Sequence, residues 1–131
     1  MNYAYEEKST QSFEDTLHTL KEAIADNAFG VLYEVNLKDK ITSKGFDFDS
    51  NFTVLDVCNP KLAKDFLDKQ IEVGYFLPCK VVVYEKDDSV YAGVLKPTIL
   101  IDMVENHDLM GAAKEVEDIL ITAVKTAVKA D

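Results

Sequence analysis

The segment FTVLDVCNP (Phe52–Pro60) begins with the alternating pattern of a strand and ends with residues that are typical of a helix start. Asn59 is a preferred N-cap residue, and Pro60 suits the first helical position because its missing N–H would have no partner there. The segment therefore predicts a strand over 52–58 and a helix that begins at Pro60. The strand has two sides that alternate along the chain, with Phe52, Val54, Asp56 and Cys58 on one and Thr53, Leu55 and Val57 on the other.

The second cysteine stands where another strand begins. The segment LPCKVVVYE (Leu77–Glu85) enters a run of valine and tyrosine that is too continuous for an ordinary surface strand, so we expect this strand at the centre of the sheet. A turn over 86–89 and a strand over 90–96 complete a hairpin. The segment between Cys58 and Cys79 has room for a helical crossover, which leaves the strands that border it either parallel or antiparallel.

The remaining elements follow from apolar periodicity and from capping residues. Ser12 is an N-cap for the first helix, and Asn27 is expected to take the left-handed conformation that ends it. Asn36 can cap a brief helix that Gly45 ends. We also predict a short peripheral strand over 3–8, a strand over 29–37, a helical turn over 99–104 and a long final helix over 108–129. In the 29–37 strand, alternation predicts one common face for Val31, Tyr33, Val35 and Leu37.

The predicted order is strand, helix, strand, short helix, strand, helix, two strands, short helix and helix. This order favours an α+β fold with a single mixed β-sheet of about five strands and helices packed mainly on one face. A chain of 131 residues with 47% hydrophobic content is in the ordinary size range of one globular domain. No repeat or linker divides it, so we expect residues 1–131 to form a single domain.

The chain is acidic, with 24 acidic residues, 14 basic residues and a net charge of −10, and every basic residue is a lysine. This charge repels phosphate backbones, so we expect no nucleic acid or membrane partner. Lysine lacks the planar fork that grips anions bidentately, which argues against strong anion recognition. The N-terminal residues have no signal-peptide pattern, and we expect a cytoplasmic protein with free thiols.

Three motifs, taken in order, resemble the family catalogued as domain of unknown function 302. They are FGVLYEV (Phe29–Val35), Cys58-Asn59-Pro60 and LPCKVVVY (Leu77–Tyr84). The resemblance spans nearly the whole chain. It implies a compact α/β domain that pairs as a homodimer and whose biochemical role is not established.

The two cysteines support one specific hypothesis, a thiol-based redox or soft-metal site. Cys58 lies just before a helix N-terminus, whose partial positive charge favours a thiolate, and Cys79 could resolve an oxidised intermediate. The alternative is that both are small buried hydrophobic residues. The thiols fall at opposite ends of the sheet if their strands are parallel neighbours, and meet at one end if the strands are antiparallel.

No other motif points to an enzyme. The chain has no glycine-rich phosphate loop, nucleophile elbow or Walker lysine, and His18 shows no ligand spacing with the cysteines. We therefore assign no catalytic residue, metal or cofactor, and expect a homodimeric binding or structural module rather than an enzyme, with a small molecule as the candidate ligand. The candidate binding residues are Cys58, Asn59, Pro60, Leu77, Pro78, Cys79 and His107.

Overall fold

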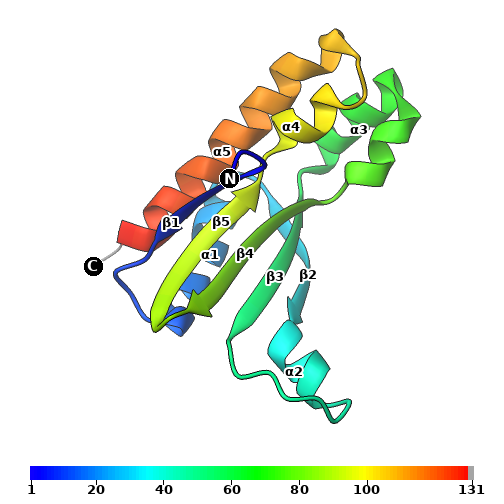
Figure 1. The fold of residues 1–131 in the computed structure, drawn as a ribbon. Coiled ribbons are helices and arrows are strands. Elements are labelled where there is room, and N and C mark those ends of the chain that lie inside the picture. Colours follow the sequence, from blue (N-terminus) through cyan, green and yellow to red (C-terminus); the bar gives the residue numbers. More distant parts are fainter. Residues whose placement is uncertain (130–131) are drawn as a thin grey trace.

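The computed structural model describes residues 1–129 and contains one five-stranded sheet of order β1-β5-β4-β3-β2 (Figure 1). The α+β class and the number of strands are confirmed, and β4 occupies the central position that its valine run predicted. The sheet is antiparallel throughout rather than mixed. The strands are β1 (Ala4–Lys8), β2 (Gly30–Asn36), β3 (Phe52–Cys58), β4 (Cys79–Lys86) and β5 (Ser89–Leu95).

The connection from β3 to β4 explains why no parallel pair forms. Helix α3 (Pro60–Lys69) packs against the 3-10 helix η1 (Ile71–Phe76), and both lie beyond one end of the sheet in Figure 1. The chain therefore re-enters the sheet at the end where it left. Of the two arrangements left open by the sequence, the structure adopts the antiparallel one, because the segment does not cross over a sheet face.

Two helices cover one face of the sheet. Helix α1 (Phe13–Asp26) and helix α5 (Met110–Lys129) pack on each other and on the strands (Figure 1). Between them and the sheet lies the core, where the fully buried side chains include Leu20, Ile24, Leu55, Val57, Val81, Val83, Leu120 and Val124. The predicted arrangement of helices mainly on one face is confirmed.

The short helices lie at the ends of the sheet. Helix α2 (Leu37–Thr42) follows β2, whereas α4 (Pro97–Asp102) packs on α5 and the 3-10 helix η2 (His107–Leu109) leads into α5. The Asn36 side chain caps α2, as predicted, and Gly45 has a positive φ of 89° just after it. At one end of the sheet, α3, η1 and α4 enclose an apolar space.

Within residues 1–129, no helix covers the opposite face of the sheet (Figure 1), and we call it the open face. Phe52, Tyr84 and Tyr91 form a row of stacked rings across β3, β4 and β5, with centroid separations of 5.2 and 5.3 Å. The Tyr84 hydroxyl donates to a Glu6 carboxylate oxygen at 2.6 Å, and Lys80 pairs with Asp56. The open face is thus aromatic at one place and charged at others.

Two local predictions need correction. The residue in the left-handed region after α1 is Ala28, with φ 65°, whereas Asn27 has φ −104° and donates its side-chain amide to the Ala23 carbonyl. In β2, a register shift between Val31 and Tyr33 interrupts the alternation. The predicted common face for these two side chains is therefore wrong, because a bulge moves the following residues to the other face.

A buried carboxylate holds α4 against α5. Glu117 is 6% exposed, and its Oε1 accepts from the Thr98 N–H at 3.2 Å and from the Thr98 hydroxyl at 2.6 Å. We expect Glu117→Val to lower the free energy of unfolding by about 1–3 kcal/mol, because both Thr98 donors lose their partner. Urea denaturation measures this. The matched control is Glu115→Val at an exposed position of the same helix, and equal losses in the two variants would contradict the assignment.

Candidate functional site

The two cysteine motifs meet at one end of the sheet. Val57 is the partner of Cys79 in the β3–β4 register, so Cys58 is one residue beyond that pair. Asn59 fixes the junction: its Oδ1 accepts from the Leu62 N–H at 3.2 Å, and its Nδ2 donates to the Ala28 carbonyl at 3.1 Å. The helix cap predicted for Asn59 is confirmed, and the same side chain also ties α3 to the turn before β2.

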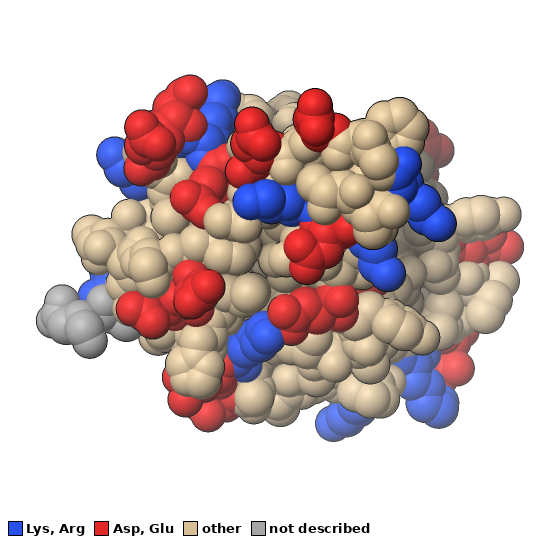
Figure 2. Space-filling model, turned by 90° about the horizontal axis from the view of Figure 1, so that it is seen from below, with Lys and Arg blue, Asp and Glu red and all other residues tan. Residues whose placement is uncertain are grey.

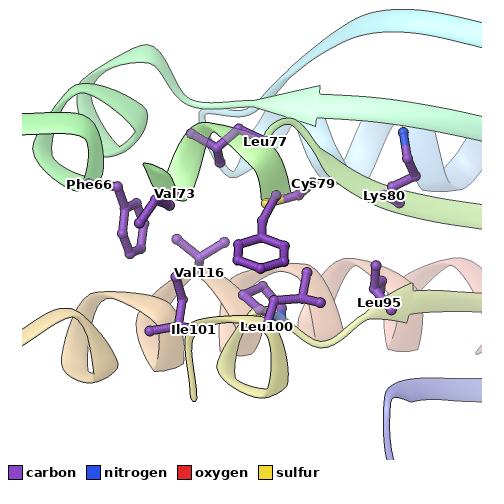
Figure 3. Close-up of a pocket in the computed structure, with 11 residues that line it drawn as sticks. Phe66, Val73, Leu77, Cys79, Lys80, Leu95, Leu100, Ile101 and Val116 are labelled. Atoms are coloured by element: carbon purple, nitrogen blue, oxygen red, sulfur yellow. The ribbon is translucent and has the colours of Figure 1, made fainter. Parts of the chain in front are cut away.

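An apolar cavity lies beside Cys79, where about 410 Å³ of space is free of protein atoms, the part open to solvent included. Its walls come from α3, η1, the first residues of β4, the end of β5, α4 and α5. Figure 3 shows the side chains of Phe66, Leu77, Leu100 and Val116 converging on this space. The full lining is Phe66, Val73, Phe76, Leu77, Cys79, Lys80, Leu95, Pro97, Leu100, Ile101 and Val116.

A smaller cavity of about 240 Å³ adjoins the first. The two share a wall that consists of Phe66, Leu77, Cys79 and Val116. The other residues around the smaller cavity are Phe29, Val57, Cys58, Asn59, Leu62 and Ala63. Both thiols therefore border one space, and Cys79 stands between the two cavities.

Burial governs the ionisation of both thiols. It raises the pKa of Cys58 and, with a smaller contribution from the neighbouring Cys58, raises the pKa of Cys79 to about 11. The position of Cys58 before a helix N-terminus favours the thiolate, but desolvation outweighs that effect here. The protonated thiol is the stable form of each residue at neutral pH.

The structure brings together only part of the set of candidate binding residues. Cys58, Asn59, Leu77 and Cys79 line one or both cavities. Pro60 is the exposed first residue of α3, and Pro78 joins Leu77 to Cys79 through a cis Leu77–Pro78 peptide bond. His107 is exposed in η2 and borders neither cavity.

Sequence reasoning did not assign most of the cavity wall to the site. Val73 and Phe76 belong to the connection after α3, and Pro97, Leu100 and Ile101 belong to the turn after β5. One signal was present, since both connecting segments carry large apolar residues without a long helix or strand to bury them. Such residues pack against other elements, and here they enclose a space between them.

Neither a metal site nor a membrane span is found among residues 1–129. No group of three or more histidine, cysteine, aspartate or glutamate side chains in this part of the chain could hold a metal ion. No helix within these residues is both long enough and apolar enough to cross a membrane.

Comparison with known proteins gives the family. A family model described as domain of unknown function DUF302 matches residues 5–127. The chain belongs to this family. The crystal structure of an uncharacterized conserved DUF302 protein from Bacillus stearothermophilus is similar, with 32% sequence identity, a TM-score of 0.93, and coverage of 97% of this chain and 99% of that chain. No curated protein matches.

Both thiols of this DUF302 protein are expected to react slowly with iodoacetamide at neutral pH. The thiolate is the reactive form, so the native rate should stay below that of the urea-unfolded chain and, for Cys79, keep rising until the pH nears 11. Mass spectrometry of Cys58→Ser and Cys79→Ser assigns each rate to one thiol. A full native rate for either thiol near neutral pH would contradict the raised pKa values.

Proposed function

We propose that this DUF302 protein is a homodimeric module that binds a small, largely apolar molecule in the larger cavity. The observation that carries the proposal is the cavity itself. It is concave and lined almost wholly by apolar side chains, with one charged residue at its edge, which is the usual character of small-molecule sites. We propose a binding module rather than an enzyme because the residues around the cavity include no acid–base pair or activated nucleophile.

The composition of the cavity wall favours an apolar ligand. Nine of its 11 lining residues are apolar, and only Cys79 and Lys80 are not. An apolar group that enters such a space gains about 25 cal/mol for each Å² that it removes from water. A ligand that carries hydrogen-bonding groups into the same space would leave them without partners.

The binding test uses N-phenyl-1-naphthylamine, a neutral dye that fluoresces in apolar surroundings. We expect saturable binding by the wild-type protein. We expect a loss of binding in Val116→Phe, because the larger side chain would occupy space beside the wall shared by both cavities. Leu100→Phe on α4 is a second variant at a less buried position, and Leu32→Phe on exposed β2 is the control. Absence of saturable binding, or equal binding by all variants, would refute the function.

Support for the homodimer comes from the open face. The stacked rings of Phe52, Tyr84 and Tyr91 remain without a helical cover, and uncovered aromatic patches are typical of protein interfaces. Figure 2 shows acidic side chains spread over the face seen from below, with lysines among them. Across the open face, by contrast, lysines balance the acids, because Lys8, Lys80 and Lys86 accompany Glu6 and Asp56.

Sedimentation velocity tests the dimer. We expect the wild-type protein to sediment as a dimer and Tyr84→Lys to shift it toward monomer, since the substitution removes the central ring of the aromatic row and puts a charged side chain in its place. Tyr75→Lys is the control because Tyr75 is 90% exposed and lies in η1, away from the row. A wild-type monomer, or a dimer unaffected by Tyr84→Lys, would refute this interface.

A thiol-based redox or soft-metal function is the second candidate, and one observation favours it: both thiols border the smaller cavity. In the redox form, hydrogen peroxide would oxidise the two thiols to a Cys58–Cys79 disulfide and be reduced to two molecules of water. Intact-mass analysis after peroxide treatment would show the loss of two hydrogen atoms. The raised pKa values oppose this function, and for that reason we place it second.

We also propose a cytoplasmic location and the absence of nucleic acid and membrane partners. The support is the net charge of −10, together with two cysteines that are free in the structure. Reducing compartments keep such thiols unpaired.

A further inference from the structure

We propose that the ligand of the larger cavity is a small hydrophobic carboxylate, whose apolar part enters the cavity and whose carboxylate meets Lys80 at the rim. This inference rests on the function proposed above and adds the chemical class of the ligand. It starts from the one charged residue in the cavity lining.

Lys80 stands at the boundary between the cavity and the open face. It is the second residue of β4, adjacent to Cys79, and lines the cavity together with Leu95 of β5. In Figure 3 its side chain lies beside the apolar cluster, with its nitrogen directed away from that cluster. The side chain is 48% exposed, so its ammonium group is in contact with solvent at the edge of the apolar space.

The remainder of the wall determines where a polar group of the ligand can go. Apart from the Cys79 thiol, the lining side chains other than Lys80 offer no hydrogen-bonding group. A charged or polar group inside the cavity would lose its hydration without compensation. The polar end of a ligand therefore has to remain at the rim, where the charge that it meets is positive.

The partner of Lys80 in the structure is the Asp56 carboxylate on β3. The pair is partly buried, because the Lys80 side chain is 48% exposed and the Asp56 side chain 19% exposed, and Asp56 is not among the residues that line the cavity. The lysine side chain has a flexible stem and a compact charge. Its ammonium group has three donors, so it can keep Asp56 as a partner while it meets a second carboxylate at the rim, and a single lysine matches one negative charge better than a doubly charged phosphate.

The location of this rim is compatible with the proposed dimer. The aromatic row crosses β4 at Tyr84, which is four positions from Lys80 and thus roughly 13 Å away at about 3.3 Å per residue. A second copy centred on the aromatic row leaves the rim at the margin of the interface. Ligand binding and dimer formation can therefore be measured separately.

Isothermal titration with octanoate and 1-octanol tests the inference, because the two share an alkyl chain and differ in charge. We expect wild-type protein to bind octanoate more tightly, by about twofold to fivefold as for an exposed charge pair, and high salt to remove the difference. Lys80→Met should abolish the preference, and Asp56→Asn should increase octanoate affinity while leaving 1-octanol unchanged. The control is Lys64→Met, which breaks an exposed lysine–aspartate pair on α3 away from the cavity.

Each result supports or overturns the inference. Equal binding of both probes by wild-type protein would overturn it while leaving the apolar binding function intact. An equal loss of affinity for both probes in Lys80→Met would also overturn it, since Lys80 would then act only through packing. An unchanged preference in Asp56→Asn would overturn it as well. If wild-type protein binds neither octanoate, 1-octanol nor the naphthylamine dye, the proposed function fails together with the inference.

Discussion

Phe66→Ala is expected to lower the free energy of unfolding by about 3 kcal/mol, the lower end of the usual range for removing a buried phenylalanine. Phe66 is 5% exposed and is the one buried residue of α3, so the helix depends on it for contact with the rest of the molecule. The neighbouring cavities already interrupt the packing around the ring. We therefore place the expected loss at the lower end of the range.

Urea denaturation measures the loss, and hydrogen exchange locates it. The amides of α3 are expected to exchange faster in Phe66→Ala, because the two cavities merge and the helix loses its anchor. Tyr75→Ala is the matched control: it also removes an aromatic ring, but one that is 90% exposed in the adjoining η1. A Phe66→Ala protein as stable as this control would show that α3 is held by other contacts.

Gly93→Ala is expected to lower the free energy of unfolding by about 1–3 kcal/mol, as overpacking does elsewhere. A Cβ atom at this position of β5 would lie 2.9 Å from the Glu6 Cβ and 2.9 Å from the Tyr5 carbonyl oxygen. One of these atoms belongs to the backbone, so β1 has to move as a whole. Its movement would also disturb the hydrogen bond between Glu6 and Tyr84.

The sign of the stability change in Gly93→Ala shows whether the crowding is present. A strand is ordinarily less stable with glycine than with alanine at an interior position. Without the crowding, Gly93→Ala would therefore raise the free energy of unfolding. The matched control is Gly111→Ala in α5, where a Cβ would meet nothing within 4 Å. That variant is expected to gain about 0.4–1 kcal/mol. Changes of the same sign in both variants would contradict the close approach of β1.

The local elements could be predicted because their causes are local. The alternation over Phe52–Cys58 and the cap formed by Asn59 depend on neighbouring residues only, and β3 and α3 begin where these patterns place them. The continuous valine run of β4 likewise indicated a central strand. The bulge in β2 was missed because its register depends on the partner strand β3.

The direction of the strands depends on where a connection packs. The chain between Cys58 and Cys79 is long enough for a crossover, and its sequence fits either arrangement. Packing of α3 on η1 at one end of the sheet gives the antiparallel pair. The same packing brings the two thiols to one space, which the sequence could offer only as one of two alternatives.

The sequence by itself determined the α+β class, most of the strands and helices, the caps at Ser12, Asn36 and Asn59, and the family. These follow from periodicity, backbone preference and ordered motifs, all of which act over short distances along the chain. Only the tertiary structure decided the antiparallel sheet, the cavity and the ionisation of the thiols. A cavity wall gathers residues from α3, β4, α4 and α5, and burial, which raises both thiol pKa values, is a property of the packed molecule.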